Sequence, residues 1–159
     1  MNDPMSGLEG LTVRRAVAGD DPRCGVILSE SVLNTSLPAR VPHAGALFAD
    51  RSPLPDGGYE RRVAELGGRL VGFLDFDPSR GYLKYLFVDP ACQRRGVGAA
   101  LLEVAERAIA GPVSLTTLSA NDEALYWYLR RGYAIVGGEL QEDWHGGPVI
   151  WLRLRKEGR

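Results

Sequence analysis

The stretch LFVDPACQRRGVGAALL, residues 86–102, decides the fold of this chain. Aromatic and branched residues are concentrated from Tyr82 to Val88 and predict a strand that ends at Asp89-Pro90. Farther along, apolar residues recur at helical spacing from Val97 to Ala108, and Gly111-Pro112 is typical of a helix end. The stretch therefore predicts a strand, a tight turn and a helix in direct succession.

The turn between this strand and helix combines two arginines, Arg94 and Arg95, with two glycines, Gly96 and Gly98. The first N–H groups of a helix have no partner inside the helix, and together with the helix dipole they attract anions. Glycines at this point let a ligand approach the backbone closely. The turn therefore indicates a site for a phosphate-bearing ligand, although the same residues also fit a plain helix start with solvated arginines.

Two familiar nucleotide-binding motifs fit this turn poorly. A dinucleotide fingerprint requires G-x-G-x-x-G in the first strand-helix unit, whereas Gly96-Val97-Gly98 comes late in the chain and is followed by Ala99-Ala100-Leu101. A P-loop requires G-x-x-x-x-G-K-[ST], which the sequence does not contain. A third interpretation, a nucleotide or nucleic-acid binder, rests only on the pairs Arg94-Arg95 and Arg130-Arg131.

Length and composition predict one globular domain over residues 1–159. The chain has 159 residues, of which 45% are hydrophobic and 25% charged, and this length is enough to bury a sizeable core. Lysine and arginine total 19 and aspartate and glutamate total 20, which gives a formal net charge of −1. This balance provides no general basic field, so we expect no nucleic-acid partner.

Cysteine content and the first residues bear on the cellular compartment. Cys24 and Cys92 are the only cysteines, and they lack the spacing of a disulfide framework or a zinc site. Residues 1–10 have neither the basic start nor the apolar core of a secretion signal, and no apolar run reaches the roughly 18 residues that span a membrane. We therefore expect a cytoplasmic protein with no metal and no membrane contact, whose residues 1–10 are flexible.

The rest of the chain predicts strands and helices in mixed order. Gly67-Gly68 is a hairpin signal, Gly137-Gly138 and Gly146-Gly147 predict turns, and the proline-containing stretch Asn34–Gly58 is expected to form a binding flap. The order β-α-α-β-β-β-α-β-α-β-β predicts a mixed α/β layer structure. The predicted elements are a strand at Leu11–Val17, helices at Gly25–Leu33 and His43–Asp50, strands at Tyr59–Leu66, Leu70–Phe76 and Tyr82–Val88, a helix that begins at Val97 and ends at Gly111-Pro112, a strand at Val113–Leu118, a helix at Asn121–Arg131, and strands at Tyr133–Val136 and Pro148–Leu154.

Two patterns resemble one known family. Gln93-Arg94-Arg95-Gly96-Val97-Gly98, preceded by Phe87-Val88-Asp89-Pro90, resembles the acyl-CoA pyrophosphate loop of the GNAT superfamily of N-acetyltransferases, whose pattern is Q/R-x-x-G-x-G/A. Residues 121–133, NDEALYWYLRRGY, are similar to that family's N-x-x-A…Y-x-x-x-G-[FY] segment. The resemblance covers roughly Tyr82 to Leu154, and the first half of the chain matches only in its expected order of elements.

This resemblance implies a GNAT-like mixed sheet of six to seven strands flanked by helices, with acetyl-CoA as cosubstrate. The parallel strands at Tyr82–Val88 and Val113–Leu118 would splay apart, and pantetheine would fit the gap. Asn121 also suits a plain helix cap, and the two roles are compatible. The implied cofactor-binding residues are Leu86, Phe87 and Val88 along the strand, Gln93, Arg94, Arg95, Gly96, Val97, Gly98 and Ala99 at the pyrophosphate, and Asn121.

The resemblance implies a catalytic role for Tyr128, which stands four residues before Gly132, where many GNAT enzymes hold a tyrosine as general acid. The alternative is an aromatic residue on the buried stripe of the helix. A backbone N–H near Val88 would polarise the thioester carbonyl. No familiar general base is visible, because Thr116 stands where some relatives have a glutamate. The remaining acceptors, each more typical of a surface charge or turn, are Glu60, Glu65, Asp75, Asp77, His43 and His145.

The resemblance predicts an enzyme that transfers acetyl from acetyl-CoA to a primary amine in a ternary complex. The missing base leaves a second hypothesis, a CoA-binding regulatory or interaction module without catalysis. The acceptor would be recognised by the loops at Asn34–Gly58 and Gly137–Gly147, where Trp144 and His145 either line the acceptor pocket or pack in a turn. The last strands either close a monomer or pair across a homodimer.

Overall fold

The computed structural model describes residues 9–49 and 58–158. Short 3-10 turns at Ala18–Asp20, Pro42–Ala44 and Pro90–Cys92 connect some of its elements. The strands are β1 (Leu11–Arg15), β2 (Glu60–Leu66), β3 (Arg69–Asp77), β4 (Tyr82–Val88), β5 (Val113–Leu118), β6 (Ala134–Trp144) and β7 (Gly147–Lys156), and the helices are α1 (Asp21–Leu33), α2 (Leu37–Arg40), α3 (Gly45–Ala49), α4 (Val97–Ala108) and α5 (Asp122–Leu129).

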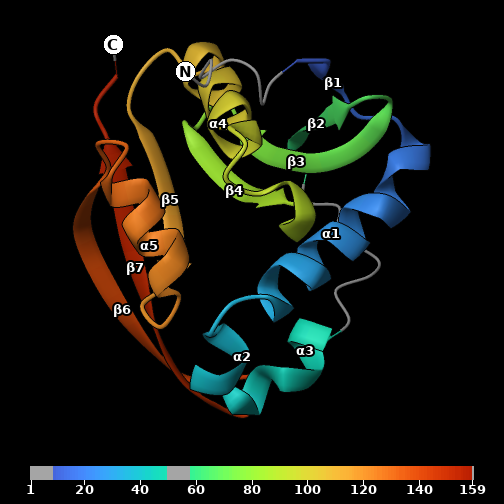
Figure 1. The fold of residues 1–159 in the computed structure, drawn as a ribbon. Coiled ribbons are helices and arrows are strands. Elements are labelled where there is room, and N and C mark those ends of the chain that lie inside the picture. Colours follow the sequence, from blue (N-terminus) through green and yellow to red (C-terminus); the bar gives the residue numbers. More distant parts are fainter. Residues whose placement is uncertain (1–8, 50–57, 159) are drawn as a thin grey trace, which may run out of the picture.

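The described strands form one mixed sheet of seven strands in the order β1-β2-β3-β4-β5-β7-β6. All neighbours are antiparallel except β4 and β5, which are parallel. Within the described chain these two strands pair only at Tyr82 and Ser114, near the start of both. Beyond that point β4 and β5 diverge, as Figure 1 shows between the green and orange strands. The predicted fold class and the splayed parallel strands are both confirmed.

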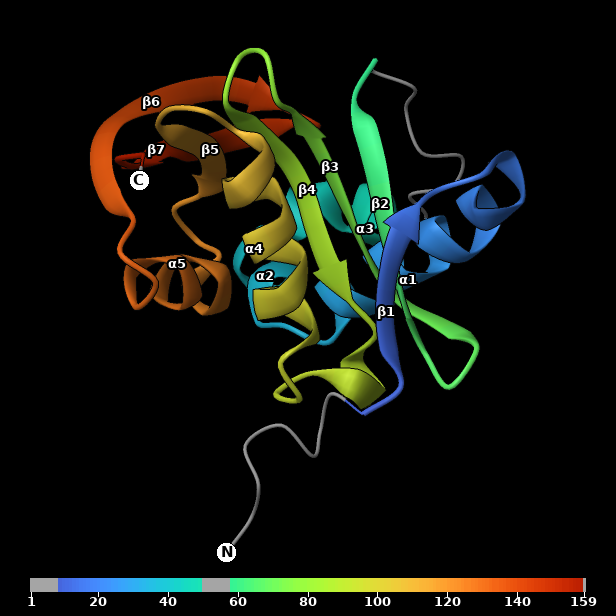
Figure 2. The ribbon, with the colours of Figure 1, turned by 90° about the horizontal axis from the view of Figure 1, so that it is seen from above.

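Helices cover both faces of the sheet. Figure 1 shows α4 on one face of β1–β4 and α1 on the other, and Figure 2 shows α4 running alongside β4 with α5 next to it. Leu101 of α4 packs with Leu74 of β3 in one buried cluster, and Ile27 of α1 packs with Phe73 in the other. Because consecutive strand residues point to opposite faces, the apolar run of β3 supplies both clusters.

The hairpin prediction at Gly67-Gly68 is confirmed. Both glycines have positive φ, +60° and +80°, as a type I′ turn between β2 and β3 requires.

The predicted turn at Gly137-Gly138, in contrast, is wrong, because both residues lie inside β6. A Cβ on Gly137 would collide with the guanidinium of Arg153, which crosses over it from β7. This glycine therefore makes room for a cross-strand side chain instead of ending a strand.

The predicted binding flap is corrected in its first half. Leu37, Val41, Ala44 and Phe48 are buried and pack into the cluster under α1, so this segment is part of the core. The predicted helix His43–Asp50 is α3 preceded by a 3-10 turn, and Asp50 lies outside the described residues. No helix within residues 9–49 and 58–158 combines the length and apolar character needed to cross a membrane.

Candidate functional site

The turn between β4 and α4 leaves a set of backbone N–H groups unused. Gly96, the N-cap of α4, has a φ of +87°, a left-handed conformation that glycine adopts at little cost. Arg94 also has a positive φ, +64°, which is uncommon for a residue with a side chain. The N–H of Ala100 reaches back to the Gly96 carbonyl at 3.0 Å. The N–H groups of residues 97–99 therefore have no partner inside the helix, an arrangement that favours a bound anion.

The second glycine of this turn has a packing role that the sequence did not reveal. A Cβ on Gly98 would lie 3.2 Å from Cζ2 of Trp127 and 3.6 Å from Cγ2 of Val88. Even an alanine would press on the Trp127 ring, so Gly98 lets α5 pack directly on the first turn of α4. The β4–α4 turn and α5 are thus in contact.

Side chains anchor the turn to its surroundings. Asp89, whose side chain is 6% exposed, pairs with Arg23 of α1 at 2.6 Å and accepts a hydrogen bond from the Ala91 N–H at 3.0 Å. Gln93 donates through Nε2 to the Val88 carbonyl at 3.2 Å. These contacts fix the path of the chain from β4 into α4. A direct contact between Gln93 and a ligand stays a prediction.

The edge of β4 that faces β5 carries unused backbone groups. The Asp89 N–H donates to the Val71 carbonyl at 2.7 Å, on the β3 side. Because backbone groups alternate along a strand, those of Phe87 also face β3, and those of Leu86 and Val88 face the diverging β5. A ligand lying between β4 and β5 would therefore meet the backbone of Leu86 and the N–H of Val88, whose carbonyl already accepts from Gln93. It would meet Phe87 only through its side chain.

Tyr128 is held on the buried face of α5. Its ring meets the rings of Trp127 and Tyr133 edge to face, at centroid distances of 5.0 and 5.4 Å. Burial raises the pKa of the Tyr128 hydroxyl above its ordinary value, so the phenol stays protonated at neutral pH. Among the described side chains only Nε2 of His43 is both fully sealed from solvent and unpartnered, so the Tyr128 hydroxyl, which bonds to no described residue, keeps slight access to solvent. A protonated phenol with no acceptor in the protein suits a general acid.

Asn121 caps α5, as predicted. Its side-chain oxygen accepts a hydrogen bond from the Ala124 N–H at 3.3 Å. The cap satisfies one of the unpaired N–H groups at the start of the helix and fixes the orientation of α5. A contact between Asn121 and a cofactor stays a prediction.

The carboxylates that the sequence offers as bases are engaged with arginines. Arg61 binds both oxygens of Asp75, at 2.7 and 2.8 Å, and Asp75 is 3% exposed. The expectation of a surface charge is wrong for Asp75, which belongs to a buried ion pair. Hydrogen bonds from Ser79 and Arg80 lower the pKa of Asp77 to about 2. Glu60 pairs with Arg62 at 3.0 Å, and Glu65 pairs with Arg14 at 2.7 Å.

The two histidines lie near the β6–β7 hairpin. The ring of His43 lies so close to Gly147 that a Cβ there would be 2.7 Å from its Cγ. His145 is in the hairpin turn with a φ of +54°. The described residues contain no group of three or more histidine, cysteine or acidic side chains that could hold a metal ion.

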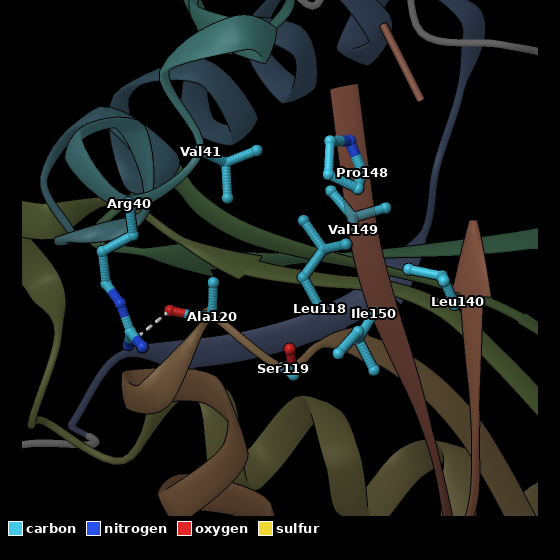
Figure 3. A pocket seen from close by; sticks show the side chains of 9 residues that line it. All are labelled: Arg40, Val41, Leu118, Ser119, Ala120, Leu140, Pro148, Val149 and Ile150. Atoms are coloured by element: carbon cyan, nitrogen blue, oxygen red, sulfur yellow. Dashed lines mark hydrogen bonds between the residues drawn. The ribbon is translucent and has the colours of Figure 1, made fainter. Parts of the chain in front are cut away.

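A pocket of about 380 Å³ opens where β5 ends, between the segment after α2 and the β6–β7 hairpin (Figure 3). Arg40 donates to the Ala120 carbonyl at 2.8 Å and pairs with Asp122 at 2.5 Å, so its charge is neutralised. Trp144, at the end of β6, is not one of the lining residues and packs against Phe48 of α3. The described residues that line the pocket are Arg40, Val41, Leu118, Ser119, Ala120, Leu140, Pro148, Val149 and Ile150.

Both segments expected to recognise the acceptor contribute to this pocket. Arg40 and Val41 come from the stretch 34–58, and Leu140 comes from the stretch 137–147. The second stretch is not the expected loop, because it consists of the end of β6 and the hairpin turn. No pattern in the sequence indicates the pocket itself, because its walls come from separate parts of the chain.

A comparison with protein families finds one match. The family model for the acetyltransferase (GNAT) domain matches residues 46–146, which include the β4–α4 turn and α5. No curated protein matches this chain.

Solved structures share the fold at low sequence identity. The GCN5-related N-acetyltransferase of Rhodopseudomonas palustris is 20% identical with a TM-score of 0.71, covering 92% of this chain and 94% of that one. The paia N-acetyltransferase of Thermoplasma acidophilum, in complex with coenzyme A, is 17% identical with a TM-score of 0.70 and coverage of 92% and 98%. The yncA protein of Salmonella typhimurium, with its cofactor acetyl-CoA, is 21% identical with a TM-score of 0.63 and coverage of 93% and 94%.

Proposed function

Because this chain belongs to the GNAT acetyltransferase family, we propose that it transfers an acetyl group from acetyl-CoA directly to the primary amine of a small molecule or protein. The observation that carries the proposal is the β4–α4 turn, where the unused N–H groups of residues 97–99 lie beside the open edge of β4. An elongated ligand with a pyrophosphate at one end and amide groups along its arm matches both features.

Each part of acetyl-CoA has a counterpart in this arrangement. The pyrophosphate binds the turn Gln93–Ala99, where backbone N–H groups supply directional bonds and Arg94 and Arg95 supply charge. The amides of the pantetheine arm bind the backbone of Leu86 like an added strand, and the Val88 N–H stays free for the thioester carbonyl. The same arm brings the thioester towards the hydroxyl of Tyr128.

The reaction then needs little from the side chains. A neutral amine attacks the thioester carbonyl, and the Val88 N–H stabilises the oxyanion that forms. As the C–S bond breaks, Tyr128 gives its proton to the sulfur. The proton lost by the amine nitrogen passes through water to the Tyr128 phenolate, which restores the phenol. No carboxylate is assigned as base, because Glu60, Glu65, Asp75 and Asp77 are all paired with arginines.

The pocket at the end of β5 is proposed to hold the acceptor. Its lining is mostly apolar, and its one charged residue, Arg40, is already neutralised by Asp122. No carboxylate among the lining residues would bind a polycation, so the acceptor is expected to carry an apolar group next to its amine. Amines such as hexylamine or phenylethylamine should therefore react better than spermidine.

Replacing Ala120 with leucine fills part of this pocket and should raise KM for the best amine. We expect an increase of about tenfold, since each buried methylene that an acceptor loses costs about 0.8 kcal/mol. The Kd for CoA, measured by calorimetry, should stay the same. Ala110→Leu adds the same group at an exposed position outside the pocket and serves as the control. An unchanged KM in Ala120→Leu would place the acceptor elsewhere.

Ligand binding and turnover can be tested separately. At 100 times Kd, CoA or acetyl-CoA should raise Tm by roughly 5–10 °C, because a ligand that binds only the folded state stabilises it by mass action. Release of free thiol with a panel of amines then measures transfer. A Tm shift without thiol release from any amine would favour the CoA-binding module, and no shift with either ligand would reject the proposal.

A further inference from the structure

The most unusual cation of the described chain lies at the end of α5. The guanidinium carbon of Arg131 is 3.7 Å from the centroid of the Trp127 ring, so the two groups are stacked. One nitrogen, Nη1, donates to the Trp127 carbonyl at 3.2 Å. A guanidinium has five N–H donors, so most of those of Arg131 remain unused. Partial burial, together with neighbouring Arg130, lowers the pKa of Arg131, as expected for a cation without a counter-ion.

This arginine lies next to the proposed pyrophosphate site. Arg131 stacks on Trp127, and the Trp127 ring also lies against Gly98 in the first turn of α4. Arg131 and the first turn of α4 therefore contact the same indole ring. Most described arginines pair with a carboxylate, including Arg23, Arg61 and Arg107. Among the described residues, Arg94 and Arg95 of the turn and Arg131 form no ion pair, as is also true of Arg15, Arg130 and Arg153.

A ligand with more negative charge than a pyrophosphate would match this surface. CoA carries a phosphomonoester on its ribose 3′ oxygen, one sugar ring away from the pyrophosphate. Arginine is the side chain best suited to such a group, because its planar fork makes paired charge-assisted hydrogen bonds while its face stacks on an aromatic ring. The stacking on Trp127 holds the fork in place before a ligand arrives, which reduces the entropy lost on binding.

We propose that Arg131, stacked on Trp127, binds the 3′-phosphate of CoA and makes the enzyme prefer CoA to 3′-dephospho-CoA. This inference rests on the proposed function, since it requires that CoA lies in the β4–α4 turn. Stacking between the two side chains then has a role in donor specificity as well as in packing. The competing explanation is that Arg131 only satisfies a carbonyl at the C-terminus of α5.

Binding of CoA and of 3′-dephospho-CoA to the wild type and to Arg131→Gln distinguishes these explanations. The wild type should bind CoA about tenfold more tightly than 3′-dephospho-CoA, as expected for a charge-assisted hydrogen bond. Arg131→Gln should bind CoA about tenfold more weakly and 3′-dephospho-CoA within twofold of the wild type. Arg107→Gln, an exposed arginine paired with Glu103 on α4, should keep the preference. Calorimetry gives all of these constants directly.

A second variant distinguishes loss of the phosphate contact from misfolding of the protein. Arg131→Lys keeps the charge and loses the planar fork, and should show an intermediate preference. Equal weakening of both ligands in Arg131→Gln, or a preference that survives in both variants, would overturn the assignment. A wild type that binds both ligands equally would also overturn it and would leave the proposed function standing. A wild type that binds neither ligand would instead contradict the proposed function.

Discussion

Replacing Tyr128 with phenylalanine is expected to lower kcat for acetyl transfer by about 100-fold or more, the usual contribution of a general acid. The change removes the proton donor and keeps the ring that packs against Trp127 and Tyr133. The hydroxyl bonds to no described residue, so its loss should leave stability and the Kd for CoA nearly unchanged. Thiol release measures kcat, and calorimetry measures the affinity for CoA.

Tyr126→Phe provides the matched control. Tyr126 lies on the same helix and is 58% exposed, so loss of its hydroxyl should have no effect on turnover. The two variants change the same atom on opposite sides of α5. If Tyr128→Phe turned over at the wild-type rate, the proton for the thiolate would have to come from another source, such as water. If CoA affinity fell together with kcat, Tyr128 would act in binding.

The β4–α4 unit could be predicted closely because its signals are local, although α4 ends at Ala108 and not at Gly111-Pro112. Asp89-Pro90 ends the strand without help from distant residues, and the helical spacing after Val97 specifies the buried face of α4. Resemblance to a known family narrowed the expected ligand to acyl-CoA, whereas the residues alone indicated any phosphate. The contacts of this segment with a ligand stay predictions, and the structure establishes only its local geometry and the cap of α5.

The remaining features depend on partners far away in sequence. Gly137-Gly138 has the local signature of a turn, but both residues lie inside β6, where the Arg153 side chain on β7 crosses over Gly137. Gly98 has the signature of a ligand contact, and only Trp127 reveals its packing role. In each case the sequence identifies the glycine, but it does not predict which distant side chain lies where the glycine has none.

The general base shows the same limit in electrostatic terms. Sequence reasoning could name carboxylates on the hairpin strands, but their availability depends on strand register. In the structure Arg61 lies directly opposite Asp75 across β2 and β3, and one arginine side chain occupies both carboxylate oxygens. A one-residue shift in register would have placed these side chains on opposite faces of the sheet.

Asp75→Asn should therefore act on stability rather than on chemistry. It leaves Arg61, whose side chain is 15% exposed, without its main partner, and breaking a buried ion pair in this way costs about 3 kcal/mol or more. Asp21, at 2.7 Å from Arg61, remains as a partner and holds the loss near the lower end of the range. Urea unfolding monitored by tryptophan fluorescence measures the change in the free energy of unfolding.

Glu60→Gln makes the same carboxylate-to-amide change on β2, at a side chain that is 36% exposed, and should cost less than about 1 kcal/mol. The kcat of folded Asp75→Asn, assayed where urea unfolding shows the native state to be fully populated, should match the wild type, because Asp75 takes no proton in the reaction. If Asp75→Asn instead kept the wild-type unfolding midpoint and lost turnover, the Asp75 carboxylate would be free enough of Arg61 to act as the base that deprotonates the amine.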